Sequence, residues 1–116
     1  MTDIKALIRE LVAGNRILAN EGVVDAWGHI SVRNPDNPNH YFLSRSRSPE
    51  LVEPDDIMEF DLDSNAIDPK GRNGFLERYL HGEIYKKRPD VMAIAHGHSP
   101  AVVPFGLTGT PLRAGR

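Results

Sequence analysis

The sequence contains no cysteine among its 116 residues, and this absence restricts the chemistry that the protein can use. Neither a disulfide framework nor a metal site with thiolate ligands can be formed. If the protein binds a metal ion, its ligands must therefore be histidine, aspartate or glutamate side chains.

Long apolar runs and basic runs are also missing from the sequence. No stretch approaches the roughly 18 apolar residues that a membrane-spanning helix needs. The N-terminal sequence MTDIKALIRELVAG does not have the basic start and unbroken apolar stretch of a signal peptide. The net charge of −2, without a basic run, argues against a nucleic-acid partner. We therefore expect no nucleic acid and no membrane as partners, with the cytoplasm as the default location.

The remaining composition, 40% hydrophobic and 26% charged residues, is that of an ordinary globular protein and predicts one domain over residues 1–116. The chain stops at Arg116, soon after an apolar stretch and without a closing helix or strand. We therefore expect the N-terminal portion of a longer, here incomplete, domain. The alternative is a complete small domain with a frayed tail.

The hydrophobic pattern alternates between helical and strand periodicity along the chain. The predicted helices cover residues 3–20, 75–87 and 99–105. The predicted strands cover residues 28–33, 40–44, 57–62 and 91–95, the first two forming a hairpin. This order predicts an α/β fold in which helices pack on a mostly antiparallel sheet.

Two spacings suggest a site for chemistry. His96 and His98 follow a predicted strand directly and are two residues apart, so their imidazoles lie on one face and can share a cation. Glu77 and His81 are four residues apart on a predicted helix, which also puts them on one face. A carboxylate there could bind the metal or transfer protons. Taken separately, each pair is better explained as ordinary surface residues.

Together, however, these motifs resemble the signature of the class II aldolase/adducin family. The matching elements are Glu77-x3-His81, Tyr85, Arg88-Pro89-Asp90, His96-x-His98-Ser99, the upstream Gly28-x-Ile30-Ser31-Val32-Arg33, and the acidic stretch 55–63. The resemblance implies a three-layer α/β/α fold and a homotetramer with sites between subunits. It also implies a divalent metal held by three histidines beside a glutamate.

Carried over to this sequence, His96 and His98 correspond to the first two metal ligands, and Glu77 to the glutamate that binds the metal or transfers protons. The third histidine is expected beyond residue 116. Zinc and manganese are the expected ions, with iron and cobalt also compatible.

Departures from the family's sugar-phosphate aldolases indicate a different substrate. Those enzymes carry asparagine at the position of His29 and two serines at the positions of Phe75 and Leu76. Because the hydroxyl donors for a phosphate are lost, we expect an unphosphorylated, flatter and less hydrated substrate. His29 and the Arg-Ser-rich loop resemble the branch of the family that decarboxylates hydroxylated aromatic or heteroaromatic acids.

On this basis the favoured function is a metal-dependent carbon–carbon lyase that decarboxylates a small-molecule hydroxy acid. The alternatives are an aldolase or epimerase for an unphosphorylated hydroxy-carbonyl compound, and a non-catalytic adducin-like binding module. His29 would protonate the carbanion or bind the departing carboxylate, although it could also be a structural histidine at a strand start. The expected substrate-binding residues are Ser31, Arg45, Ser46, Arg47 and Phe75, with the two arginines otherwise belonging to a solvated loop.

Overall fold

A computed structural model describes residues 3–21 and 28–96, together with the backbone of residues 105–107. Its two helices are α1 (Ile4–Asn20) and α2 (Arg78–Lys87). Its strands are β1 (His29–Arg33), β2 (His40–Ser44), β3 (Ile57–Asp61), β4 (Ala66–Ile67), β5 (Ala93–His96) and β6 (Phe105–Leu107). The short 3₁₀ helices η1 (Pro49–Leu51) and η2 (Pro54–Asp56) lie between β2 and β3.

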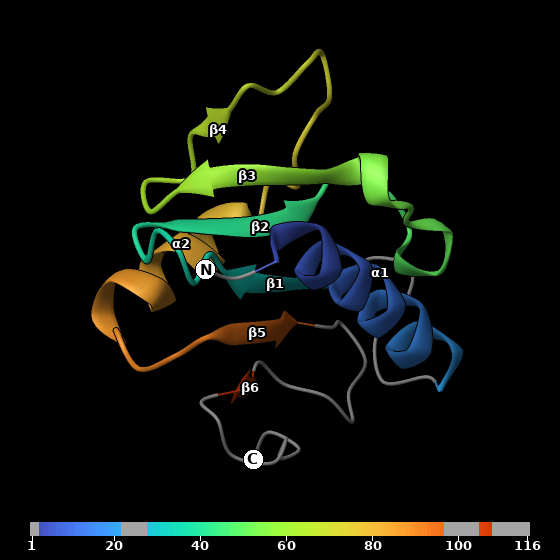
Figure 1. Cartoon of the computed structure of the whole chain (residues 1–116), viewed down its shortest axis with the longest axis horizontal. Coiled ribbons are helices and arrows are strands. Elements are labelled where there is room, and N and C mark those ends of the chain that lie inside the picture. The colour runs from blue at the N-terminus through green and yellow to red at the C-terminus, as the bar shows by residue number, and fades with distance from the viewer. Residues whose placement is uncertain (1–2, 22–27, 97–104, 108–116) are drawn as a thin grey trace.

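The six strands form one sheet in the order β4-β3-β2-β1-β5-β6, which Figure 1 shows from top to bottom. All five pairings between neighbouring strands are antiparallel. The expected hairpin of β1 and β2 is confirmed, with Val32 opposite Phe42. Strand β5 then pairs with the other edge of β1 and sets His29 opposite His96.

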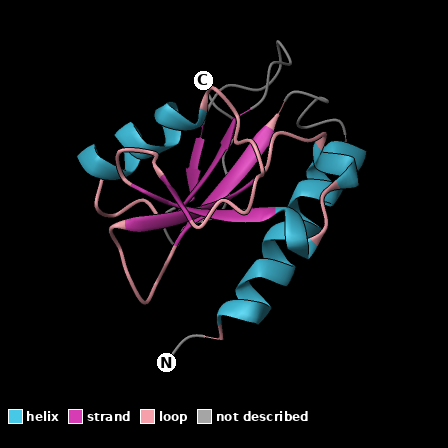
Figure 2. Cartoon of the chain, turned by 90° about the horizontal axis from the view of Figure 1, so that it is seen from above, coloured by secondary structure: helices cyan, strands magenta, loops and turns pink. Residues whose placement is uncertain are grey.

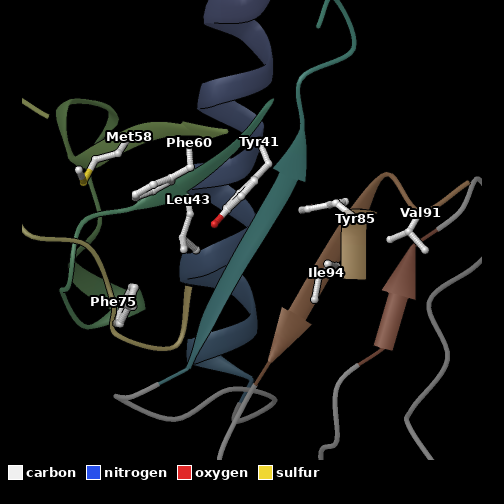
Figure 3. Packing of buried hydrophobic residues seen from close by; sticks show 8 residues of the cluster. All are labelled: Tyr41, Leu43, Met58, Phe60, Phe75, Tyr85, Val91 and Ile94. Atoms are coloured by element: carbon white, nitrogen blue, oxygen red, sulfur yellow. The ribbon is translucent and has the colours of Figure 1, made fainter. Parts of the chain in front are cut away.

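The two helices cover opposite faces of this sheet, as the view from above shows (Figure 2). On one face α1 packs through Leu11 and Val12 against Ile30 and Phe42. On the other face α2 contributes Tyr85 to a cluster that spans the sheet, whose side chains Figure 3 shows. That cluster consists of Tyr41, Leu43, Met58, Phe60, Phe75, Tyr85, Val91 and Ile94. The predicted three-layer α/β/α arrangement is therefore confirmed.

Strand periodicity decides which residues of β1 and β5 reach the α2 face. Ile30 packs on the α1 side, so its neighbours His29 and Ser31 project toward α2. In β5 Ala95 packs on the α1 side and Ile94 on the α2 side. His96, two residues after Ile94, therefore shares the α2 face with His29.

Several predicted boundaries need correction. The second helix begins at Arg78 rather than residue 75, and β5 begins at Ala93 rather than residue 91. The third predicted helix is wrong at Phe105, which belongs to strand β6 and pairs with Ala95. A short apolar segment does not distinguish strand from helix by its periodicity, and here sheet pairing decides. The rest of that predicted helix lies outside the described residues. Among the helices that the structure describes, none is long and apolar enough to cross a membrane.

The packing of α2 against the turn after β3 depends on Gly82. A Cβ atom at this position would lie 2.5 Å from Ser64 Oγ and 2.6 Å from the carbonyl oxygen of Leu62. We expect Gly82→Ala to lower the free energy of unfolding by about 1–3 kcal/mol, because the helix must shift away from this turn.

Gly14 in α1 provides the matched control, since a Cβ there would meet nothing within 4 Å. Gly14→Ala is expected to stabilise the protein by about 0.5–1 kcal/mol, because alanine favours the helix. Urea denaturation of both variants measures the difference. Equal effects of the two substitutions would contradict the close approach of α2 to the turn.

Candidate metal and proton-transfer site

Three of the predicted site residues, Glu77, His29 and His96, meet at one end of the α2 face of the sheet. Glu77 is the N-cap residue of α2, but its side chain makes no capping hydrogen bond. One carboxylate oxygen, Oε1, lies 3.4 Å from His29 Nε2, and the other, Oε2, lies 3.9 Å from His96 Nε2. The start of a helix also favours a negative charge at this position. Glu77 therefore joins the two strand histidines.

His29 lies at the centre of this group and is fully buried. Its ring stacks on His96 with 5.3 Å between the ring centroids and contacts Phe75 at 4.7 Å. Its Nδ1 atom lies 2.6 Å from His81 Nε2, within hydrogen-bonding distance. His81 thus lies beside one ring nitrogen of His29, and Glu77 lies beside the other.

His81 is also fully buried, unlike a residue of an ordinary helix-surface pair. Burial, followed by the nearby imidazoles of His29 and His96, lowers the pKa of His81 well below its usual range. The second ring nitrogen, Nδ1, lies 2.6 Å from Ser31 Oγ. His81 therefore remains neutral in the folded protein over the physiological pH range.

This depressed pKa predicts a specific dependence of stability on pH. Below about pH 6.5 the unfolded chain protonates His81 whereas the folded chain does not, so proton uptake favours unfolding. We expect the free energy of unfolding to be fully retained above about pH 7. It should then fall as the pH decreases, by up to about 1.4 kcal/mol per pH unit from this group.

Urea denaturation of the metal-free protein between pH 5 and 8 measures this slope. In His81→Gln the slope should be smaller, because glutamine does not titrate. Tyr41→Phe is the control, since Tyr41 is also fully buried and burial raises its pKa to about 12, so it does not titrate in this range. An unchanged slope in His81→Gln would refute the assignment.

The donor atoms of Glu77 and His96 are compatible with a divalent cation. Zinc–nitrogen and zinc–oxygen distances are about 2.0–2.2 Å, so two ligand atoms on one tetrahedral ion lie about 3.4 Å apart. His96 Nε2 and Glu77 Oε2 are 3.9 Å apart, so a small movement of the two side chains would bring both atoms onto one ion. Within ranges 3–21 and 28–96, no three histidine or acidic residues form a metal cluster, and His98 lies outside the described residues.

Not all of the predicted substrate-binding residues are exposed in the structure. Ser31 is fully buried and its hydroxyl lies between His81 and the Tyr85 hydroxyl, which is 2.8 Å away. Phe75 is only 8% exposed and belongs to the core cluster, while the neighbouring Leu76 is 86% exposed. Ser31 and Phe75 are therefore buried in this structure, and their contact with a substrate stays a prediction. Leu76, rather than Phe75, presents an apolar surface next to Glu77.

The Arg-Ser-rich loop is attached to the segment that leads into Glu77. Arg45 forms a β-bridge with Gly74. The amide of the exposed Ser46 donates a hydrogen bond of 2.7 Å to the carbonyl of Asn73. The two segments are therefore joined through their backbones.

The two arginines of this loop differ in what their side chains contact. Arg47 forms an ion pair with the buried Asp56 at 2.9 Å, so it anchors its own loop. Arg45 has no side-chain ion pair within the described part of the chain and stays a candidate for binding a carboxylate.

The buried hydrogen-bond chain behind His29 was not predicted from the sequence. Tyr85 was recognised only as part of a motif, and Ser31 was expected to contact a substrate. The available signal was the two-residue period of β1, which puts Ser31 on the same face as His29. Which helix residues meet that face depends on how α2 packs on the sheet.

Comparisons with known proteins agree with this fold. The family model described as "Class II Aldolase and Adducin N-terminal domain" matches residues 9–114. Decarboxylase tropJ of Talaromyces stipitatus is 38% identical over 108 residues, covering 91% of this chain and 41% of the relative. The 3,4-dihydroxyphthalate decarboxylase of Arthrobacter keyseri is 37% identical over 116 residues, covering 90% of this chain and 46% of the relative.

Among solved structures, the L-fuculose 1-phosphate aldolase from Glaciozyma antarctica has a TM-score of 0.73 and 33% sequence identity. The match covers 82% of this chain and 41% of that chain. This chain thus spans less than half the length of the relatives named here. Because the family model covers nearly all of the sequence, the chain belongs to the class II aldolase and adducin family.

Proposed function

We propose that this chain forms part of a divalent-metal-dependent decarboxylase that acts on a hydroxylated aromatic or heteroaromatic acid. The observation that carries the proposal is the position of His29, fully buried against His96 and 3.4 Å from a carboxylate oxygen of Glu77. The similarity to two decarboxylases, at 38% and 37% identity, supports it.

The metal ligands in this proposal are His96, His98 and Glu77. When bound, the divalent ion would act as a Lewis acid that stabilises negative charge on the substrate oxygen next to the reacting carbon. Zinc and manganese are both consistent with imidazole and carboxylate ligands, as are iron and cobalt.

In the proposed reaction, Glu77 takes the proton of the substrate hydroxyl and delivers it to the carbon that bears the carboxylate. The bond between this carbon and the carboxylate then breaks, and its electron pair returns through the ring to the oxygen. Carbon dioxide leaves, and water supplies the proton that restores the hydroxyl. His29 lies beside Glu77 and is proposed to hold the departing carboxylate.

The apolar side chain of Leu76 supports a flat substrate, because it is exposed next to Glu77. The side chains of Phe75 and Leu76 cannot donate hydrogen bonds to a phosphate. We propose Arg45 and the exposed Ser46 as groups that could bind a second polar group of the substrate.

The test is release of carbon dioxide from ortho-hydroxylated aromatic acids, beginning with 3,4-dihydroxyphthalate. We expect release in the presence of zinc or manganese, and its loss after treatment with EDTA, with recovery when the ion is restored. Decarboxylation that persists undiminished in EDTA would exclude the metal-dependent reaction.

The second candidate is an aldolase, and the 33% identity to an L-fuculose 1-phosphate aldolase is the observation that favours it. Release of a small aldehyde from a hydroxy-carbonyl compound, without carbon dioxide, would support this alternative over decarboxylation.

We also propose that the working assembly is a homotetramer. An apolar surface beside Glu77 supports burial against another subunit, since Leu76 is 86%, Tyr79 51% and Leu80 36% exposed. Light scattering coupled to size-exclusion chromatography gives the mass of the assembly, and a monomer would refute this part of the proposal.

A further inference from the structure

Behind His29 a continuous line of polar groups runs into the core. Tyr85 OH lies 2.8 Å from Ser31 Oγ, and Ser31 Oγ lies 2.6 Å from His81 Nδ1. His81 Nε2 then lies 2.6 Å from His29 Nδ1, and His29 Nε2 faces Glu77 Oε1 at 3.4 Å. Tyr85, Ser31, His81 and His29 are each at most 1% exposed.

Each contact in this line needs one hydrogen atom, and a neutral imidazole carries one hydrogen on only one of its two ring nitrogens. In one arrangement Tyr85 donates to Ser31, and Ser31 donates to His81 Nδ1. His81 Nε2–H then donates to His29 Nδ1. The hydrogen of His29 is left on Nε2, where it faces the carboxylate of Glu77.

The opposite arrangement reverses every bond. His29 Nδ1–H would donate to His81, His81 Nδ1–H to Ser31, and Ser31 to Tyr85. Within the described ranges, Ser31 Oγ is the hydrogen-bond partner of the Tyr85 hydroxyl, so that hydroxyl would be buried without an acceptor. This alone disfavours the reversed arrangement by about ten-fold. A lone pair of His29 Nε2 would also face a carboxylate oxygen.

Two further observations agree with the first arrangement. Burial raises the pKa of Tyr85 well above its usual range, so its hydroxyl keeps its hydrogen and can donate it. Burial also keeps His81 neutral, as its lowered pKa indicates, so that it can accept on one nitrogen and donate from the other.

We propose that Ser31, with Tyr85 behind it, is a positioning residue that keeps the hydrogen of His29 on Nε2. His29 thereby presents a fixed N–H donor to Glu77 and to the carboxylate of a bound substrate. The donation to a substrate carboxylate rests on the proposed decarboxylase function, whereas the position of the hydrogen on His29 does not.

NMR of the protein with ¹⁵N-labelled histidine rings tests the position directly at pH 8, because long-range ¹H–¹⁵N correlations identify the nitrogen that carries the hydrogen. The protein is measured without metal and after addition of zinc. We expect His29 and His81 both to carry their hydrogen on Nε2 in the metal-free protein. Hydrogens on Nδ1 of both rings would overturn the proposal.

Substitutions of Ser31 then test its part. In Ser31→Ala the fraction of molecules in which His29 and His81 carry their hydrogen on Nδ1 should rise about five-fold or more, because His81 no longer receives a hydrogen bond from the serine. Ser31→Thr keeps a hydroxyl and should retain the native pattern. Tyr41→Phe is the matched control, since it removes another fully buried hydroxyl, one that contacts Ser64 and the carbonyl of Arg78.

If His29 and His81 keep their hydrogens on the same nitrogens in Ser31→Ala as in the native protein, Ser31 does not determine these positions and its proposed role is overturned. If the protein decarboxylates, kcat of Ser31→Ala should fall by about ten-fold while Ser31→Thr recovers most of it. If no decarboxylation is found, the NMR result still decides where the hydrogen lies. Failure of the proposed function and failure of this inference are therefore distinguishable.

Discussion

Replacing Glu77 with glutamine is expected to lower the rate of the proposed decarboxylation by about 10²–10⁴-fold, because the amide cannot accept and return a proton. Glutamine has nearly the same shape, and the native side chain is 48% exposed, so the fold should be retained. Initial rates of carbon dioxide release measure the effect, and circular dichroism checks the fold. Elemental analysis reports whether the variant also binds less metal.

Glu83→Gln is the matched control for this substitution. Glu83 lies in the same helix, is exposed and pairs with Lys86. Its substitution should leave the rate within about two-fold of the native value, since surface ion pairs contribute little. A rate in Glu77→Gln equal to that in Glu83→Gln would remove Glu77 from the mechanism.

The largest effect on stability is expected at Arg33, which is 4% exposed at the end of β1. Its guanidinium donates to the carbonyls of Val91 and Pro38 at 2.9 and 2.6 Å, and to those of Tyr85 and Arg88 at 2.9 and 3.1 Å. A cation at this place also complements the C-terminal end of α2. One side chain thus joins β1, the turn after it and the end of the helix.

We expect Arg33→Met to lower the free energy of unfolding by about 3–5 kcal/mol, because buried carbonyl groups lose their donors. Arg33→Lys should recover only part of this loss, since an ammonium group cannot reach four carbonyls in the same geometry.

Urea denaturation measures both effects, with Arg9→Met as the control. Arg9 is exposed on α1, and its substitution should change stability by less than about 0.5 kcal/mol. A similarly small change in Arg33→Met would contradict the structural role assigned to the guanidinium.

Local sequence patterns were sufficient for much of the fold. The helical periodicity of apolar residues predicted α1, and in the structure the side chain of Asp3 caps this helix by accepting a hydrogen bond from the amide of Ala6. The predicted hairpin of β1 and β2 also formed, and residues 34–39 between its strands are the prolines, asparagines and aspartate that favour turns. These elements depend on neighbours in the sequence, so their signals are local.

The site was predictable as a list of residues and less so as an arrangement. The resemblance to a family identified Glu77, His29 and His96, and the structure brings these three together. The burial of Ser31 and Phe75 and the pairing of Arg47 with Asp56 were not anticipated. These features arise where segments far apart in the sequence pack together, and no periodicity within one segment reports them.

The contact between His29 and His81 joins residues 52 positions apart in the sequence. The side chains of the site come from segments far apart in the sequence, so they meet only in the folded chain. Any ligand that binds this group of side chains selects the folded chain as a whole. Such a ligand should therefore raise the melting temperature by mass action, and thermal shift becomes a direct screen for the substrate.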